Sequence, residues 1–394
     1  MLLAEHGQAR KTPALSQLCH RAKNLYNLAN FYVRQELFLL ENVLSYFDLN
    51  YTLCAQQAYQ ALPAQTAQQV LRQVAGDWRS FFAACQACRK DPGKFLGVPH
   101  PPRYKQKGGE CVATSTNQQC RMREGWLHFP KKAGLPPTRT RVTRPQQVRV
   151  VPKGGYYVIE VIYHKDALRP GLDPRRALGV DLGVANLVTA ANNVGIAPFA
   201  ISGGAATSVN QFYNKELARL QSAAAKAHEG RTTKRLQRLA RTRTTKVGDI
   251  FPKASRAVVN FCTRHHIGTI AIGHNSRWKQ GCRLGRRNNQ AFVFLPFPAL
   301  IQQVQYKAEL AGIVVVLVDE RYTSRCSFAD GEVVGRHAQH AGQRIKRGLF
   351  RARSGVIINA DVNAAYNILR QGVPEAFADG IEGAGLHPVL IGLA

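Results

Sequence analysis

Three carboxylates stand where apolar segments of this chain end or begin. Asp181 ends the apolar start of GVDLGVANLVTA, Glu320 ends IVVVLVDE, and Asp361 lies at the start of the helical pattern INADVNAAYNILR. Carboxylate oxygens are preferred ligands of hard cations, and two such cations can hold the attacking and leaving oxygens of an in-line phosphodiester hydrolysis. Each acid alone also has an ordinary explanation, because Asp is common at strand ends and as a helix N-cap, the position that Asp361 resembles. Together the three are candidate ligands of Mg²⁺ or Mn²⁺.

The elements around these acids predict one sheet that brings them together. Residues 172–202 have the pattern of three antiparallel strands, with Asp181 at the end of the first. A short buried strand, IGTIAIGHN, then precedes a helix, PFPALIQQVQYKAELAG, and the strand that ends at Glu320. The final helix carries Asp361. This order is that of an RNase H-like mixed sheet, in which acids at strand ends and at a helix start surround one point.

The rest of the chain predicts an α/β multi-domain fold. Residues 14–90 have amphipathic helical patterns, whereas short alternating runs with a hairpin turn at Lys153-Gly154-Gly155 follow a Pro- and Gly-rich stretch. We expect the following division: 1–13, an N-terminal segment of a small β-barrel; 14–90, a helical lobe; 91–170, the β-barrel; and 171–394, the domain of the three acids, with a basic helical insertion at 207–256.

The charge of the chain indicates a polyanionic partner. Lys and Arg number 54 against 24 Asp and Glu, which gives a net charge of +30 among 394 residues. Such an excess destabilises a compact chain through self-repulsion unless a polyanion neutralises it, which favours nucleic acid. No apolar run approaches the roughly 20 residues that span a bilayer, and the N-terminus lacks the apolar region of a signal peptide. We therefore expect a cytoplasmic protein without a membrane partner.

Three basic clusters are candidates for contact with nucleic acid. A run of cations in a helical pattern is usually a solvated face, but the first cluster has too few acids for i,i+4 ion pairs. The second cluster combines cations with a Trp that could stack on bases, although a surface loop with a packed Trp is an equal alternative. The candidates are Arg231, Lys234, Arg235, Arg238 and Arg241; Trp278, Lys279, Arg286 and Arg287; and Lys346 and Arg347.

The cysteines argue against a disulfide framework. There are nine of them, scattered along the chain, and an odd, scattered set is typical of reduced thiols. The close pair Cys85 and Cys88 lies in a helical pattern with an apolar face, and no second pair follows at the spacing of a zinc site.

Four strings resemble, in order and spacing, the OrfB/TnpB family of insertion-sequence nucleases, which are relatives of type V CRISPR effectors. These strings are GVDLGVANLVTA, IAIGHNSRWKQ, RYTSRCSF and INADVNAAYNILR. The resemblance implies a helical recognition lobe, a wedge-like β-barrel and a RuvC-type nuclease domain in 171–394. It also implies an RNA-guided, Mg²⁺-dependent DNA endonuclease of a transposable element in prokaryotic cytoplasm, associated with the nucleoid. Its partners would be a guide RNA from the transposon end and double-stranded DNA with a short adjacent motif. Asp181 matches the first RuvC acid of the family and Asp361 the third.

The second acid of the family is missing, because Gly273 and His274 stand where a carboxylate is expected. One interpretation is a nuclease without activity. We favour relocation of the acid to Glu320, since we expect the strand that ends there to be parallel and adjacent to the strand that carries Gly273. His274 is a weaker substitute, because imidazole is a poor ligand for Mg²⁺.

The four-cysteine zinc ribbon of the family is also incomplete. Between RYTSRCSF and the last acid only Cys326 remains, with His337 and His340 nearby, and a fourth ligand is not evident from the sequence. We therefore expect a degenerate finger at 325–356 without zinc.

Two other functions stay open. A guide RNA-dependent DNA-binding protein or repressor without cleavage would explain the lost acid, although Asp181 and Asp361 are retained. A transposase that joins strands itself is less consistent with the sequence, since no Tyr nucleophile with a metal-binding His pair stands out.

Overall fold

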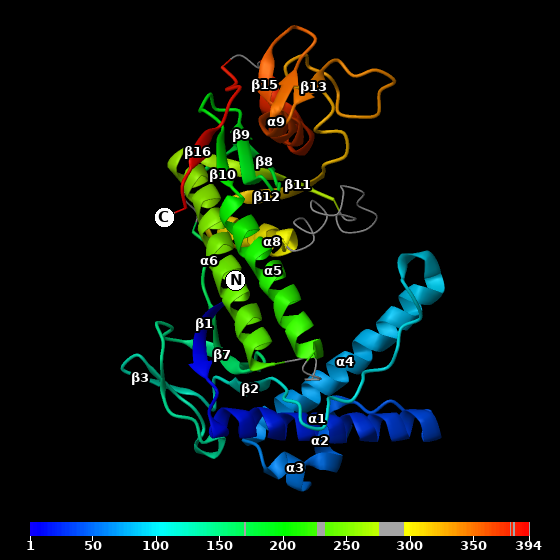
Figure 1. Cartoon of the computed structure of the whole chain (residues 1–394). Helices are drawn as coiled ribbons and strands as arrows, with labels where there is room; N and C mark the ends of the chain where they lie inside the picture. Colours follow the sequence, from blue (N-terminus) through cyan, green and yellow to red (C-terminus); the bar gives the residue numbers. More distant parts are fainter. Residues whose placement is uncertain (169–170, 227–232, 276–294, 379, 381–382, 394) are drawn as a thin grey trace. The chain divides into compact units, whose positions relative to one another are not determined.

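The computed structural model describes residues 1–168, 171–226, 233–275, 295–378, 380 and 383–393. The chain divides into two compact units, Met1–Lys165 and Asp166–Ala394. Both are drawn in Figure 1, and each is described here by itself. Within the described residues, none of the helices is both long enough and apolar enough to cross a bilayer.

The first unit begins with a strand, which four α-helices follow. These are β1 (Leu2–Arg10), α1 (Pro13–Leu40), α2 (Tyr46–Leu53), α3 (Gln57–Gln60) and α4 (Ala64–Lys90). Helix α1 begins where the Thr12 side chain accepts a hydrogen bond from the Leu15 amide, as an N-cap does. Helices α1 and α4 pack together around the buried Trp78, whose indole nitrogen donates to Asn30 at 2.8 Å.

The strands of the first unit form two sheets, where the sequence predicts one barrel. The larger sheet has the order β1-β7-β6-β2, with β2 (Ala113–Thr116), β6 (Pro145–Pro152) and β7 (Tyr156–His164), all antiparallel. The smaller contains β3 (Arg121–Arg123), β4 (Trp126–His128) and β5 (Thr138–Arg139). The predicted hairpin joins β6 to β7, and its turn glycines Gly154 and Gly155 have positive φ. The described strands of this unit thus form two separate antiparallel sheets, and the division of the chain into domains stays a prediction.

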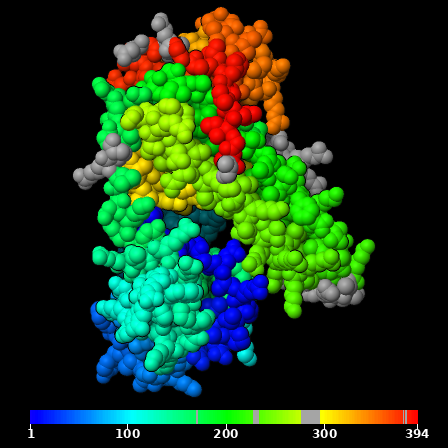
Figure 2. Space-filling model, turned by 90° about the vertical axis from the view of Figure 1, so that its left-hand side faces the viewer, coloured from blue at the N-terminus to red at the C-terminus, as the bar shows by residue number. Residues whose placement is uncertain are grey.

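The second unit contains a six-stranded mixed sheet of order β12-β11-β8-β9-β10-β16. The strands are β8 (Asp173–Asp181), β9 (Asn186–Asn192), β10 (Phe199–Ser202), β11 (Ile267–His274), β12 (Val314–Asp319) and β16 (Val389–Ile391). β8, β9 and β10 form the predicted antiparallel meander, β11 pairs parallel to β8, and β12 pairs parallel to β11. β16, which the sequence does not predict, adds in parallel to β10. Figure 2 shows this last segment, in red, on the surface of the unit.

Helices cover the two faces of this sheet, as Figure 1 shows. α6 (Lys234–Arg264) and α8 (Phe297–Leu310) pack on one face with Leu178 and Val180 of β8, and α5 (Gly204–Lys226) packs on α6. α9 (Ala360–Gly372) packs on the other face with Ala177. Side chains alternate along a strand, so Asp181 shares the α9 face with Ala177.

Between β12 and α9 lies the segment expected as a finger. Residues 320–342 contain neither helix nor strand. They lead to a three-stranded antiparallel sheet of β13 (Gln343–Lys346), β14 (Leu349–Arg351) and β15 (Ile357–Asn359). In the part of the chain that the structure describes, there are also three short 3₁₀ helices: Pro92–Lys94, Lys131–Ala133 and Pro374–Phe377.

Candidate active site

Glycines let helix α9 lie unusually close to the sheet. A Cβ atom added at Gly179 of β8 would overlap the backbone oxygen of Ala365, and one at Gly372 would lie 2.6 Å from the Ala271 Cβ. Real Cβ atoms do not approach other atoms this closely, so only glycine permits this packing. The close packing brings the first turn of α9, which carries Asp361, to the end of β8.

Asp181 is the last residue of β8 and lies among negative charges. Its carboxyl is partly exposed, and its pKa is raised to about 8 by burial first, then by Asp361 and then by Glu320, while Arg344 acts in the opposite direction. One carboxylate raises the pKa of another in this way only when the two groups are close together. The structure therefore brings the three predicted acids together at one end of the sheet.

Asp361 lies in the first turn of α9 without capping the helix. The N-cap is Asn359, whose side-chain oxygen accepts hydrogen bonds from the amides of Asp361 and Val362 at 3.0 and 3.1 Å. The Asp361 carboxylate instead accepts a hydrogen bond of 2.9 Å from the Asn186 amide group. Its other oxygen lies 3.8 Å from the Arg344 guanidinium. The capping role that the sequence left open thus belongs to Asn359.

Glu320 lies beside the position of the missing second acid. A Cβ atom at Gly273 of β11 would be 3.5 Å from the Glu320 Cβ, and 2.6 Å from the Cδ1 atom of Ile368 in α9. Because β12 is the neighbour of β11, the residue that follows β12 enters the space that a side chain at 273 would use. Ile368 fills the remainder of that space.

The immediate neighbours of these positions point elsewhere. Asp319, which precedes Glu320, is exposed and pairs with the Arg321 guanidinium at 2.8 Å. His274 follows Gly273 and is opposite Asp319 in the β11–β12 register. Since consecutive strand residues project to opposite faces, neither shares the face of Gly273.

Two residues that contact Asp361 were not predicted, Asn186 and Arg344. Asn186 is the first residue of β9, five positions after Asp181. The only sign of its role in the sequence is that a polar residue begins the buried run NLVTAAN. Arg344 was indistinguishable from the other cations of its basic stretch, because only the fold places it next to Asp361.

The basic candidates have different surroundings. Lys234, Arg235, Arg238 and Arg241 are exposed along the first half of α6, whose single acidic residue is Asp249. Lys346 and Arg347 are exposed at the end of β13. Arg231, Trp278, Lys279, Arg286 and Arg287 lie outside the described residues.

One cation of the α6 run has a structural role. The Arg243 guanidinium donates a hydrogen bond of 2.7 Å to the Asn210 side-chain oxygen and lies 5.2 Å from the centroid of the Tyr213 ring. Asn210 and Tyr213 both belong to α5, so Arg243 joins α5 to α6.

The zinc candidates Cys326, His337 and His340 also lie together. The Cys326 sulfur is 3.7 Å from Nδ1 of His340. A ring nitrogen of His337 lies within 4.8 Å of the same sulfur. The expectation of a finger without metal rested on the lack of a fourth ligand. Glu332 lies beside these side chains, with its Oε1 atom 3.2 Å from Nδ1 of His340, and the ligand atoms of Cys326, Glu332 and His337 lie within 4.8 Å of one another.

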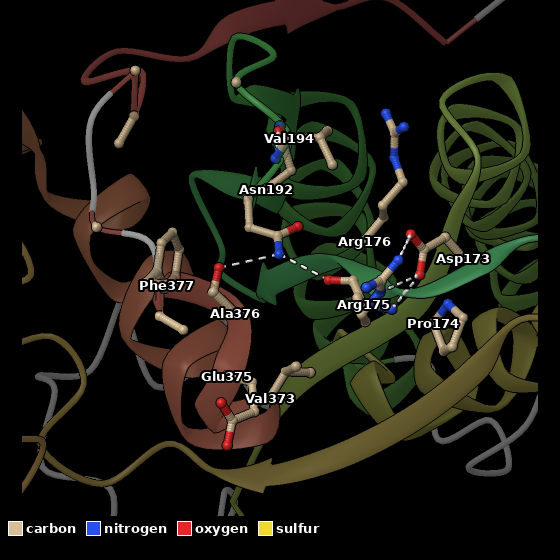
Figure 3. A pocket seen from close by; sticks show the side chains of 16 residues that line it. Asp173, Pro174, Arg175, Arg176, Asn192, Val194, Val373, Glu375, Ala376 and Phe377 are labelled. Atoms are coloured by element: carbon tan, nitrogen blue, oxygen red, sulfur yellow. Dashed lines mark hydrogen bonds and ion pairs between the residues drawn. The ribbon is translucent and has the colours of Figure 1, made fainter.

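A pocket of about 790 Å³ lies at the opposite end of β8. Asp173, Arg175 and Arg176 line one side and Ala376 and Phe377 the other, as Figure 3 shows. Asp173 and Asp181 are the first and last residues of one strand, which places the pocket about 25 Å from the three acids. Asp173 is also paired with Arg175 at 3.3 Å. The pocket is therefore separate from the acidic site.

Comparison with known families matches two segments of the chain. Residues 157–279 match OrfB_IS605, described as a probable transposase, and residues 297–368 match the Cas12f1-like TNB domain. The first match contains Asp181 and Gly273, and the second contains Glu320 and Asp361. The two segments are therefore similar in sequence to these two families, each over less than half of the chain.

Individual relatives agree with these matches. The chain is 29% identical over 222 residues to the CRISPR-associated endodeoxyribonuclease Cas12f1 of Sulfoacidibacillus thermotolerans, which covers 54% of this chain. The match spans about half of the length of that relative, 49%. A solved Cas12f1–sgRNA–target DNA complex contains a chain with a TM-score of 0.58 and 14% identity, over 90% of this chain and 81% of that one. This similarity extends to the fold.

Proposed function

We propose that the protein is an RNA-guided DNA endonuclease of an insertion sequence, with a Mg²⁺-dependent RuvC-type site at Asp181, Glu320 and Asp361. The observation that carries the proposal is the convergence of these three carboxyls, expressed in the raised pKa of Asp181. The donor set fits a hard divalent cation, because oxygen ligands suit Mg²⁺ or Mn²⁺ and because a cation relieves the mutual repulsion of the acids.

Each residue of the site has a defined task. Asp181, Glu320 and Asp361 would hold the metal ions, and Asn186 orients one oxygen of Asp361 by the hydrogen bond of 2.9 Å. Arg344, 3.8 Å from the other oxygen, offsets part of the negative charge. Mg²⁺ held by these carboxylates would supply Lewis-acid stabilisation of the scissile phosphate and activation of the attacking water. In the hydrolysis, a water oxygen forms a bond to phosphorus as the bond to the leaving sugar oxygen breaks.

Recognition would be divided between RNA and protein. A guide RNA from the transposon end would read the target by base pairing, and the protein would hold the heteroduplex by its shape and charge and read a short adjacent motif. We assign phosphate contacts to Lys234, Arg235, Arg238 and Arg241 of α6 and to Lys346 and Arg347. The net charge of +30 supports these partners.

A second candidate function is guide-dependent DNA binding without cleavage, as in a repressor. The observation that favours it is Gly273, which leaves β11 without the acid of the family. The position of Glu320 beside Gly273 favours cleavage instead, because a carboxylate from the next strand enters the same space.

One experiment separates the two functions. The protein is purified with RNA co-expressed from the transposon end, the RNA is sequenced, and a plasmid library with a randomised motif is incubated with Mg²⁺ or with chelator. Guide-dependent cleavage with Mg²⁺ alone is the expected result. Guide-dependent binding without cleavage would favour the repressor, and random cellular RNA in the preparation would contradict both functions.

A further inference from the structure

Glu320 lies outside the regular structure of the sheet. The pairing of β12 with β11 ends at Asp319, one residue before Glu320. A carboxylate that holds metal ions has to be kept within about 0.5 Å of its working position. Contacts other than the strand pairing must therefore hold Glu320 in place.

A tight turn follows directly after β12. The amide and the hydroxyl of Thr323 both donate to the Glu320 carbonyl oxygen, at 3.2 and 2.8 Å. These two hydrogen bonds close a four-residue turn from Glu320 to Thr323. Thr323 is buried, so the backbone of Glu320 is tied to a residue whose own surroundings are fixed.

Helix α9 holds the other end of this turn. The amide nitrogen of Asn367 donates hydrogen bonds of 2.8 Å to the carbonyl oxygens of Thr323 and of Cys326. Asn367 is fully buried and lies less than two helical turns after Asp361. The helix that carries one of the three acids therefore also holds the turn that begins with another.

The backbone of this turn is strained at its third residue. Tyr322 has a φ of 69°, in the left-handed region that is unfavourable for a residue with a large side chain. Glycine or asparagine is usual where this position of a turn has a positive φ. Such strain persists only where the surrounding structure over-determines the conformation, and it is concentrated at functional sites. The hydrogen bonds of Thr323 and Asn367 supply that constraint.

Asn367 also has an unfavourable feature of its own. Its side-chain oxygen is buried and accepts no hydrogen bond from the residues that the structure describes. Leucine has nearly the same shape and no polar atom to leave unpaired, so packing alone would favour leucine at this position. The amide is explained by the two hydrogen bonds that its nitrogen donates to the segment after Glu320.

We propose that Asn367 and Thr323 are positioning residues of the acidic site, which hold Glu320 at a fixed distance from Asp361. The inference rests on the proposed function, because it takes Glu320 as a metal ligand. Both residues act through the backbone of Glu320 rather than by contact with metal or DNA. Their hydrogen bonds explain how an acid beyond the end of a strand can replace an acid within the neighbouring strand.

Two variants of nearly unchanged shape remove these hydrogen bonds, Asn367→Leu and Thr323→Val. The matched control is Asn193→Ala, because the Asn193 side chain also joins separate backbone segments by hydrogen bonds, but beside the pocket at the opposite end of β8. Each full-length protein is studied without metal or nucleic acid by hydrogen-exchange mass spectrometry, and then by calorimetric titration with Mn²⁺. The plasmid cleavage assay and chemical denaturation complete the comparison.

We expect the amides of residues 320–328 to exchange at least about tenfold faster in Asn367→Leu and Thr323→Val. Mn²⁺ should bind at least about tenfold more weakly to both, and cleavage at limiting Mn²⁺ should fall by a similar factor. Guide and target binding should be unchanged. Asn193→Ala should keep the exchange of residues 320–328, the Mn²⁺ affinity and the cleavage rate of the unmodified protein.

A rescue variant separates positioning from general stability. Asn tolerates the left-handed conformation, so Tyr322→Asn should make the turn less dependent on Asn367. Added to Asn367→Leu, it should restore the Mn²⁺ affinity by roughly fivefold. Gly248→Ala, in α6 and with nothing near its Cβ position, should restore none of it.

Three results would overturn the proposal. These are unchanged exchange and Mn²⁺ affinity in Asn367→Leu and Thr323→Val, equal losses in Asn193→Ala, and equal restoration by Gly248→Ala and Tyr322→Asn. If the unmodified protein bound guide and target without cleaving DNA, the proposed function would fail instead. Hydrogen exchange and Mn²⁺ affinity would then still decide whether Asn367 positions Glu320.

Discussion

At Asp181, burial and two neighbouring carboxyls act in the same direction on the pKa. The value of about 8, against an ordinary 3.8, means that the metal-free folded protein keeps a proton that the unfolded chain releases. In this window the folded state binds more protons, so stability falls as pH rises from about 4 to about 8.

The variant Asp181→Asn removes this titration and should lessen that fall. In chelator, we expect its free energy of unfolding to exceed that of the unmodified protein by an amount that grows between these pH values and then levels off. Denaturant unfolding at several pH values measures the difference, and addition of Mg²⁺ should reduce it by stabilising the ionised form. A difference that is constant with pH would contradict the raised pKa.

The three acids should be equally necessary for cleavage. Asp181→Ala, Glu320→Ala or Asp361→Ala should lower the cleavage rate by roughly a thousandfold or more, because residues that act as a unit have non-additive, large effects. Gel assays of cleavage and of guide and target binding separate the two properties, and binding should survive in all three variants.

Asp319→Asn and His274→Ala are the matched controls for these variants. Asp319 is paired with Arg321 on the other side of the strand, and His274 is on the opposite face from Gly273. Both variants should retain most of the activity. If Glu320→Ala cleaved while His274→Ala did not, the assignment of Glu320 would be wrong.

Gly273 allows a direct test of relocation. Since its Cβ position is 3.5 Å from the Glu320 Cβ, Gly273→Asp should restore part of the cleavage lost in Glu320→Ala. Ile368→Val removes the Cδ1 atom that would lie 2.6 Å from the new Cβ, so the triple variant should recover more than the double variant. Recovery is measured with the same plasmid assay. If neither the double nor the triple variant cleaved DNA, the inference that the side chains at positions 273 and 320 occupy the same space would be wrong.

At the scale of elements, the contact of α9 with the sheet depends on Gly179. Gly179→Ala should destabilise the protein by about 2 kcal/mol or more, because the new methyl overlaps the backbone of α9. Gly248→Ala, within α6 and with nothing near its Cβ position, should instead stabilise it by about 0.5–1 kcal/mol. Chemical denaturation measures both. Equal stability of the two variants would contradict the close packing.

Local patterns predicted the strands that carry the acids, but not every element around them. β8, β11 and β12 are apolar runs with clear ends, so these strands and their order along the chain were predicted from the sequence. β16 has only three residues, Val389–Ile391, and is a strand because β10 offers an edge. The sheets of the first unit depend likewise on pairings between distant residues, which periodicity does not report.

The candidate sites divide in the same way. Asp181, Glu320 and Asp361 were predicted because each ends or begins a regular element. Glu332 was not predicted to lie with Cys326 and His337. It belongs to an irregular segment, where the spacing of residues along the chain does not tell which way a side chain points. Asp361 was a possible N-cap from the sequence, and only the hydrogen bonds give that role to Asn359 instead.

For the whole molecule, 54 basic against 24 acidic residues predict binding that depends strongly on salt. Each phosphate contact that releases a counterion adds about 0.7–0.9 to the slope of log affinity against log salt. A variant with Lys234, Arg235, Arg238 and Arg241 changed to Gln should therefore bind guide RNA more weakly, with a slope smaller by up to about 3.

The matched control for this variant is Arg219→Gln on α5. Arg219 is also exposed, but it is paired with Glu216 at 2.8 Å, so its loss should change the slope little. Filter binding or fluorescence anisotropy at several salt concentrations measures both slopes. The preference among RNA sequences should be the same in both variants, because phosphate contacts carry no base information. If the fourfold α6 variant kept the slope of the unmodified protein, these four side chains would not contact the RNA. Other basic residues of this chain, whose net charge is +30, would then bind the phosphates.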